Sequence, residues 1–422
     1  MAGNDGVKRY LTELLKAFMT FDRHANLIFE IDLYVQGKAP FSLSDHITEL
    51  ADKIASIKEN PPVEIKLLQI KKSIRSVLPD LVYRLFKRIY ASLPIRYFLR
   101  NLNIKLAKKD AKKLKKEFEK YDLIHVPLPQ NFHYLNEVDG KFLVTIHDLS
   151  HLLYPEFHTQ DNIRRSSKGI DLIFKKKARL LAVSEATKKD ILKFYPVGPE
   201  EIHTVYESFD EDLFFPKKVH ALLRKVLSKY NLPYCRYFLS LSTLEPRKNI
   251  SNMLKAFDLF SKKVDEKVGF FVCGKTGWKM NDLKSQQFAS NKNVFFTGFI
   301  SDEDLSILYS HALALCYVSF YEGFGLPPVE AMACGTTVIY GDSSAMPEVI
   351  GNAGLPANPD NVVDIKNQME KIFNDKALRT SLCQKALERA SLFSRKKMAI
   401  DTLKLYQDLI EGHLQPKNRA GS

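Results

Sequence analysis

The chain has 422 residues, of which 45% are hydrophobic and 27% charged, and its formal net charge is +14 at pH 7. This balance is ordinary for a globular protein and excludes a chain that is disordered over most of its length. The length is sufficient for two domains, each with its own hydrophobic core.

The five cysteines are odd in number, show no pair with metal-ligand spacing, and several lie in apolar runs. We therefore expect buried free thiols and a reducing compartment. The N-terminal residues contain no apolar stretch typical of a signal peptide, and no apolar run is long enough to span a membrane. We expect neither a cleaved leader nor a membrane-spanning helix.

The first predicted element is a helix over 10–18, which follows a loop at 4–10 with the composition of a strand-to-helix connection. Such a loop should follow a strand, but only three residues precede it. We therefore expect that the central first strand of this domain is missing.

A basic segment follows, because residues 66–120 contain 17 Lys or Arg against four Asp or Glu. Within it, residues 77–99 mix apolar and basic side chains at helical spacing, which favours a basic amphipathic helix on an anionic membrane. The alternative is a solvated helical hairpin that packs its apolar side on the first domain. Nucleic acid is disfavoured, since the aromatic residues alternate with aliphatic ones and form no stacking platform.

Elsewhere, short apolar runs alternate with longer amphipathic stretches, a pattern typical of βα units with parallel sheets. Ser184 is expected to cap a helix over 186–194. The two halves join near 207–216, and ligands of such sheets bind at the carboxyl ends of the strands. We expect strands at 28–35, 123–126, 142–146, 180–183, 202–206, 237–241, 269–273, 294–297, 313–318 and 337–340.

The segment 322–330 lies between the expected strand at 313–318 and a helix predicted over 327–334. Gly323 and Gly325 have no Cβ, so the backbone there can approach a ligand closely. The helix N-terminus favours an anion such as a diphosphate, and Glu322 and Glu330 are good acceptors for sugar hydroxyls. The alternative is an ordinary helix start with a favourable acidic residue.

The string EGFGLPPVEAMACG at 322–335, followed by SSAMPEVI at 343–350, resembles the large family of retaining GT-B glycosyltransferases with a Glu-x7-Glu motif. Segments 240–249, 273–278, 296–305, 144–149 and 182–185 carry the same resemblance, which omits only 38–120. It implies two Rossmann-like doubly wound α/β domains that face a central cleft. Their expected bounds are 1–206, with a basic helical insertion at about 62–120, and 207–392, followed by a C-terminal helix at 393–414 that packs back on the first domain.

The resemblance also implies roles for residues of the Glu-x7-Glu segment. Glu330 should hold the ribose hydroxyls of the donor nucleotide, and Glu322 should contact the transferred sugar. The expected backbone contacts to the donor come from Gly323, Phe324, Gly325 and Leu326.

Arg247 and Lys248 should neutralise the diphosphate leaving group, since Arg is a bidentate phosphate clamp and Lys a compact point charge. The alternative is an exposed basic pair that opens a helix over 249–260. Cations at a helix N-terminus are locally unfavourable, which favours an anionic ligand.

His147, at the end of the strand at 142–146, corresponds to a histidine that in related enzymes binds the donor sugar near its 6-position. A structural role is the alternative for such a residue at a strand end. Gly6 and Lys8 lie in the first loop, which by resemblance faces the diphosphate and the acceptor. The nucleobase is expected near Gly274 and Ile300, held largely by backbone contacts.

The chain departs from the family pattern at three places. Ser242 and Thr243 stand where many relatives have Gly-Arg, Glu207 and Ser208 replace the usual Asn-Gly, and Lys8 replaces a second glycine.

Two Asp-x-Asp patterns, at 210–212 and 302–304, resemble the metal sites of a different glycosyltransferase fold. The first lies in the connection between the halves and the second opens a helix, where Asp is a common cap. We expect no metal and no cofactor besides the sugar nucleotide, because cationic side chains and a helix N-terminus can stabilise the leaving group.

The predicted reaction is transfer of a hexose to a glycan or polyprenyl-diphosphate-linked acceptor in polysaccharide assembly. The favoured hexose is mannose, with GDP-mannose as the donor. The predicted location is the cytoplasm, at the inner face of the cytoplasmic membrane, with residues 66–120 on the anionic lipid surface. Two alternatives stay open: another sugar-nucleotide enzyme of this fold, such as an epimerase, and a catalytically inactive donor-binding or scaffolding subunit.

Overall fold

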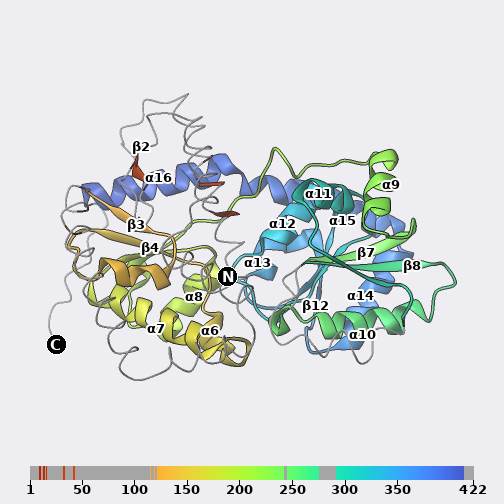
Figure 1. Cartoon of the computed structure of the whole chain (residues 1–422), viewed down its shortest axis with the longest axis horizontal. Coiled ribbons are helices and arrows are strands. Elements are labelled where there is room, and N and C mark those ends of the chain that lie inside the picture. Colours follow the sequence, from red (N-terminus) through yellow and green to blue (C-terminus); the bar gives the residue numbers. More distant parts are fainter. Residues whose placement is uncertain are drawn as a thin grey trace, which may run out of the picture. The chain divides into compact units, whose positions relative to one another are not determined.

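The computed structural model describes residues 9, 10, 13, 14, 16, 32, 33, 41, 42, 115, 118, 121–241, 245–274 and 291–412 (Figure 1). The chain divides into two compact units. The first comprises 1–17, 121–133 and 140–422, and the second comprises 18–120 and 134–139. Both parallel sheets described below belong to the first unit.

Among the described residues, the N-terminal sheet has four parallel strands in the order β3-β4-β5-β6. They are β3 (Ile124–Val126), β4 (Phe142–Ile146), β5 (Arg179–Ala182) and β6 (Ile202–Thr204). All five residues of β4 are buried, as expected for a strand covered on both faces. The four strands confirm the sequence predictions to within two residues at each end.

Helices α6 (Ser150–Leu153), α7 (Gln160–Lys175) and α8 (Glu185–Phe194) accompany this sheet, with 3₁₀ turns η1 (Pro129–Leu135), η2 (Pro155–Phe157) and η3 (Pro199–Glu201). The predicted N-cap of α8 is confirmed, because the Ser184 side chain accepts a hydrogen bond from the backbone N–H of Thr187. That bond satisfies one of the N–H groups that a helix start leaves without an intrahelical acceptor.

The described part of the C-terminal sheet has six parallel strands in the order β12-β11-β10-β7-β8-β9. The five predicted strands of this half are confirmed, and β12 was not predicted. Phe238 and Phe270 pack with Phe257 and Phe260 of α10 in a buried core. The strands are β7 (Arg236–Leu241), β8 (Val268–Cys273), β9 (Val294–Gly298), β10 (Leu315–Tyr317), β11 (Val338–Gly341) and β12 (Gly354–Ala357).

The helices of this half are α9 (His220–Lys229), α10 (Ile250–Ser261), α11 (Asp302–His311), α12 (Leu326–Ala333), α13 (Met346–Ile350), α14 (Val362–Asn374) and α15 (Lys376–Ala390), with 3₁₀ turns η4 (Pro246–Lys248), η5 (Gly351–Ala353) and η6 (Ser391–Phe393).

The last helix, α16 (Arg395–Glu411), contacts the N-terminal sheet. The Tyr406 hydroxyl lies 2.6 Å from Nδ1 of His125 in β3, and Lys141 Nζ donates to the carbonyls of Leu409 and Ile410 at 3.1 and 2.8 Å. The domain bounds at 206 and 392 remain predictions.

The strand predicted at 28–35 is described only at Asp32–Leu33, which form strand β1. Its expected parallel pairing is wrong, because β1 pairs antiparallel with β2 (Phe41–Ser42). Seven residues separate the two strands, which is too short for the crossover that a parallel pair needs.

The predicted helix over 10–18 is confirmed at the described positions, since Arg9, Tyr10, Glu13, Leu14 and Lys16 are all helical. The loop with Gly6 and Lys8, the missing first strand and the helix at 77–99 lie outside the described residues, as does nearly all of 66–120. None of the described helices combines the length and hydropathy that crossing a bilayer requires.

Candidate functional site

The loop 322–325 joins β10 to α12 at the carboxyl end of the C-terminal sheet. Gly325, the N-cap of α12, has a φ of +99° that side chains disfavour. A Cβ on Gly323 would lie 1.7 Å from the carbonyl oxygen of His147, so only glycine fits there. The Gly323 carbonyl accepts hydrogen bonds from Ser184 Oγ at 2.6 Å and Thr187 Oγ1 at 3.3 Å, which fixes the loop against the N-terminal sheet.

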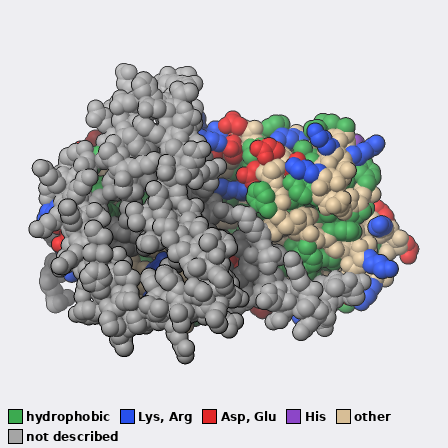
Figure 2. All heavy atoms as spheres, viewed as in Figure 1, with side chains coloured by type: hydrophobic (Ala, Val, Ile, Leu, Met, Phe, Trp, Pro, Cys, Tyr) green, Lys and Arg blue, Asp and Glu red, His purple; other side chains and the backbone are tan. Residues whose placement is uncertain are grey.

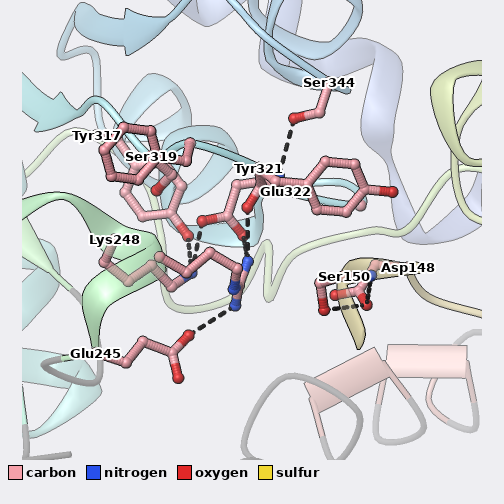
Figure 3. Close-up of polar contacts among 12 residues, drawn as sticks. Asp148, Ser150, Glu245, Lys248, Tyr317, Ser319, Tyr321, Glu322 and Ser344 are labelled. Atoms are coloured by element: carbon pink, nitrogen blue, oxygen red, sulfur yellow. Dashed lines mark hydrogen bonds and ion pairs between the residues drawn. The ribbon is translucent and has the colours of Figure 1, made fainter. Parts of the chain in front are cut away.

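Glu322 is the centre of a buried cluster that both predicted cations join. Its carboxylate accepts hydrogen bonds from Arg247 Nη1 at 2.9 Å and Lys248 Nζ at 2.7 Å. Arg247 Nη2 also donates to Glu245 at 2.8 Å, and Lys248 donates to the Tyr317 hydroxyl at 2.8 Å. Figure 3 shows Glu245, Lys248, Tyr317 and Glu322 converging from β7–α10 and β10–α12. The carboxyl ends of β7 and β10 therefore bring Glu322, Arg247 and Lys248 together, and their roles in donor binding stay predictions.

Electrostatics in this cluster favour the ionised form of Glu322 and disfavour that of Lys248. Burial alone would raise the pKa of Glu322, but Arg247 and Lys248 override it and lower the pKa to about 2. Burial lowers the pKa of Lys248 despite the attraction of Glu322. The two acidic residues, Glu245 and Glu322, and the two basic residues, Arg247 and Lys248, give the cluster balanced formal charges.

The cluster can still bind an anion. Arg247 uses three of its five N–H groups and Lys248 two of its three on acceptors among the described residues. The remaining three N–H groups are available to donate to a ligand such as a diphosphate.

Glu330 lies in α12 and is 2% exposed. Arg9 forms ion pairs with both Glu330 and Asp302, linking the first helix to α12 and α11. Burial raises the pKa of Glu330 to about 7, although Arg9 acts in the opposite direction. The charge of Glu330 therefore changes near neutral pH, and Arg9 occupies the carboxylate to which we assigned the donor ribose.

His147 follows β4, and both of its ring nitrogens have acceptors. Nδ1 lies 2.8 Å from Glu207 Oε1, and Nε2 lies 3.0 Å from the carbonyl oxygen of Pro127. The ring of Tyr10 packs edge-on at 5.0 Å. Burial lowers the pKa of His147, but the hydrogen bond and charge of Glu207 exceed that effect, and the net shift is upward.

The remaining predicted residues are spread along the strand ends. The backbone N–H of Gly274, just after β8, donates to the carbonyl of Gly298 at 2.8 Å, and Ile300 is buried beyond β9. The ring of Phe324 packs on Phe393 at 5.4 Å, and Leu326 begins α12. Gly6 lies outside the described residues.

The Asp-x-Asp carboxylates contact cations of the chain. Asp210 and Asp212 each lie 3.1 Å from Arg395, and Asp304 lies 2.5 Å from Lys229. Within the described ranges, no group of three or more His, Cys, Asp or Glu could hold a metal ion. These ion pairs give both patterns a structural role, and the expectation that the reaction needs no metal stays a prediction.

Sequence reasoning missed five residues of the site: Arg9, Asp148, Glu207, Glu245 and Tyr317. Asp148 and Glu245 stand inside the quoted motifs, so their positions could have suggested them. Burial would raise the pKa of Asp148, but Arg247 and hydrogen bonds from Ser150 lower it. Glu207 is a departure from the family pattern to which the resemblance assigns no role, and no local signal marks Arg9 or Tyr317.

Comparison with known proteins identifies relatives of both halves. Residues 233–389 match the family described as Glycosyl transferases group 1, and residues 69–213 match Glycosyltransferase Family 4. O-antigen chain mannosyltransferase B of Escherichia coli is 31% identical over 63% of this chain and 70% of its own length. O-antigen chain mannosyltransferase RfbU of Salmonella typhimurium is 34% identical over 51% of this chain and 56% of its own length. The serotype-specific mannosyltransferase WbdA of Escherichia coli is 28% identical, and the chain spans 32% of it.

Solved structures share the arrangement of the two sheets. Sucrose-phosphate synthase from Thermosynechococcus elongatus superposes with a TM-score of 0.59 at 21% identity, covering 73% of this chain and 80% of that one. HepE from Anabaena, in a complex with UDP-glucose, superposes with a TM-score of 0.61 at 19% identity, covering 71% and 82%. These likenesses show the fold. Given the 31% identity over 70% of mannosyltransferase B, the chain belongs to the group 1 glycosyl transferases and has the GT-B fold.

Proposed function

We propose that the chain transfers a mannosyl group from a nucleoside-diphosphate sugar to a glycan acceptor during assembly of a bacterial surface polysaccharide. GDP-mannose is the favoured donor. The observation that carries this proposal is the buried cluster of Glu322, Arg247 and Lys248 beside the N-terminus of α12. The similarity to O-antigen mannosyltransferases supports mannose and the polysaccharide product.

The proposed mechanism retains the anomeric configuration by front-face displacement. The departing phosphate oxygen takes the proton of the acceptor hydroxyl, and the acceptor oxygen attacks the anomeric carbon from the same face. Arg247 and Lys248 would stabilise the charge that develops on the diphosphate. Glu322 orients the cations and the sugar. Because its pKa is held at about 2, it is ionised at neutral pH and cannot serve as a general acid.

Lys248→Ala tests the site. We expect kcat to fall by roughly 10²- to 10³-fold, the scale seen when one donor to a developing oxyanion is removed. Lys262→Ala is the matched control, because Lys262 is an exposed lysine just after α10 that pairs with Asp258, away from the Glu322 cluster. Wild-type turnover in Lys248→Ala would remove the proposed role of the cluster.

Donor and reaction class are tested with a thermal-shift screen of sugar nucleotides, because a ligand that binds only the folded state raises the melting temperature. Transfer from the stabilising donor to a polysaccharide acceptor supports the proposal. Conversion of the donor alone to an isomer would identify an epimerase, and binding without transfer to any acceptor would identify a donor-binding subunit.

We also propose a lipid-linked acceptor and a peripheral site at the inner face of the cytoplasmic membrane, through the basic segment 66–120. On the face shown in Figure 2, the described part carries Lys and Arg together with Asp and Glu. In the sequence, residues 66–120 hold 17 Lys or Arg against four Asp or Glu, which is most of the net charge of +14. Flotation with liposomes should depend on anionic lipid and weaken at high salt. Equal flotation with neutral liposomes would remove the membrane proposal.

A further inference from the structure

A partly buried pair at the carboxyl edge of the N-terminal sheet, His147 and Glu207, carries a further inference. His147 follows β4 and Glu207 follows β6, with β5 between them. The side chains of His147 and Glu207 are 18% and 7% exposed, and Glu207 Oε1 lies 2.8 Å from Nδ1. The other ring nitrogen, Nε2, lies 3.0 Å from the carbonyl oxygen of Pro127.

The partners of the ring determine its protons. A backbone carbonyl can only accept a hydrogen bond, so Nε2 must carry a hydrogen. An ionised carboxylate can also only accept, so Nδ1 must carry one as well. With both nitrogens protonated, His147 is an imidazolium. The remaining arrangement, a protonated Glu207 that donates to Nδ1, would give a neutral pair.

The other ionisable groups around the ring are compatible with the imidazolium. Asp148, the next residue, adds a negative charge that favours a cation at His147. Burial and the charge of His147 lower the pKa of His125 to about 3, so His125 is neutral and does not compete. Tyr10 presents a buried ring whose hydroxyl lies 3.3 Å from Thr145 Oγ1.

We propose that Glu207 is a positioning residue that keeps His147 as a fixed imidazolium beside the donor-binding loop, so that His147 acts as a hydrogen-bond donor and a positive charge, not as a general base. The proposal rests on the proposed transferase function. The main-chain carbonyl of His147 lies so close to Gly323 that a Cβ there would be 1.7 Å from its oxygen, so His147 adjoins the loop that carries Glu322.

The two hydrogen bonds of His147 differ in strength. The bond to the carboxylate of Glu207 joins two charges, whereas the bond to Pro127 involves a neutral carbonyl. A donor-sugar hydroxyl can therefore replace the Pro127 carbonyl at Nε2, while Glu207 retains Nδ1. This assignment requires the sugar oxygen to be the acceptor.

The protonation state is measured directly, without activity, by nitrogen NMR of histidine-labelled protein, with the His147 signal assigned from its loss in His147→Gln. We expect both nitrogens of His147 to be protonated at neutral pH in the wild-type protein. In Glu207→Gln the amide can still donate to Nδ1, so the ring stays in place but becomes neutral, and its titration midpoint moves to lower pH. Asp148→Asn, which removes a nearby charge without removing a bond to the ring, should change the midpoint less.

The kinetic test uses the same variant. Glu207→Gln should lower kcat roughly 10- to 100-fold at neutral pH, the scale of one charge-assisted hydrogen bond. The deficit should shrink as the pH is lowered and His147 is protonated again, a pattern that a purely structural defect would not produce.

A neutral His147 in the wild-type protein would overturn the proposal even if the chain is an active transferase. An unchanged imidazolium in Glu207→Gln would remove the role of Glu207. Conversely, if the protein transfers no sugar but His147 is an imidazolium, the proposed function is contradicted. The assigned protonation state of the His147–Glu207 pair would then still hold. If Glu207→Gln does not fold, the wild-type measurement alone decides the protonation state.

Discussion

At the scale of single residues, Glu330 combines burial, a raised pKa and an ion pair with Arg9. It is buried in α12 and is held by Arg9, a residue 321 positions away in the sequence. For the donor ribose to bind Glu330 as proposed, its hydroxyls must share or replace the contact with Arg9. The ionised carboxylate is the better acceptor for two hydroxyls, so the charge of Glu330 should control affinity.

We predict that affinity for the sugar nucleotide rises as the pH increases through about 7, because burial raises the pKa of Glu330 to about 7 and the residue ionises there. Glu330→Gln should weaken binding by roughly 10-fold above that pH and flatten the pH dependence. Calorimetric titration with the intact sugar nucleotide measures this, since its diphosphate has no terminal group that titrates near pH ~6.

Glu303→Gln, which changes an exposed carboxylate on the neighbouring α11, serves as the control for that measurement. An unchanged pH dependence in Glu330→Gln would show that another group controls binding.

The resemblance to a known family identified Glu322, Arg247 and Lys248, and local patterns located the strands that each of them follows. It missed Arg9 and Glu207 because their partners lie 321 and 60 positions away in the sequence. An ion pair between distant segments depends on tertiary packing, which one sequence does not encode in any local spacing.

At the scale of elements, the start of α8 is stabilised from outside its own segment. Ser184 caps the helix, while the carboxylate of Glu348 in α13 accepts from the backbone N–H groups of Glu185 and Ala186 at 2.7 and 2.9 Å. A negative charge at a helix N-terminus is favourable, and here it connects the two sheets.

We predict that Glu348→Ala increases hydrogen exchange at the amides of Glu185 and Ala186 by roughly 10-fold, since each loses a charged acceptor. The amide of Thr187 should change less because Ser184 still accepts from it. Glu388→Ala, an exposed change in α15, should leave all three unchanged. Equal exchange in Glu348→Ala and the wild-type protein would contradict this account.

Strands with long apolar runs were predictable, whereas β12 was not. Its sequence Gly-Leu-Pro-Ala has low strand propensity, and it pairs only with β11 at the edge of the sheet. Gly354 is required there, because a Cβ would lie 2.4 Å from the carbonyl oxygen of Val338. Tertiary pairing therefore overrides local preference at this edge.

At the scale of the whole molecule, one ion network joins three distant parts of the chain. Arg395, at the start of α16, binds Glu13 of the first helix at 2.8 Å and Asp210 of the connection at 3.1 Å. Lys16 binds Glu13 and Asp210 at 3.1 and 2.6 Å. Arg395 is the more buried of the two cations, with 14% of its side chain exposed.

We predict that Arg395→Gln lowers the free energy of unfolding by about 1–3 kcal/mol, since it leaves the buried carboxylate of Glu13 with Lys16 alone. The midpoint of urea unfolding measures the change. Lys397→Gln, which breaks only an exposed pair with Asp401 one turn further along α16, should shift the midpoint little. If the two substitutions shift the urea midpoint equally, the network contributes no more to stability than an exposed surface ion pair.

The fold of the whole molecule was predictable from the motifs and the strand spacing, because two doubly wound sheets follow from repeated βα units. The fold of the N-terminal region was not predictable. Its described departure from the predicted parallel sheet is the antiparallel pair of β1 and β2. Short strands without a long apolar run show no hydrophobic periodicity, so the sequence does not indicate whether they pair in parallel or antiparallel.

The course of α16 has a consequence for cleavage of the chain. The backbone leaves the N-terminal sheet after β6, and α16 returns to it, with Tyr406 on His125 and Lys141 on the end of the helix. A protease that cuts the exposed connection at Lys218 would therefore produce two fragments that stay associated under native conditions. They would migrate as one species on a sizing column and separate only in denaturant.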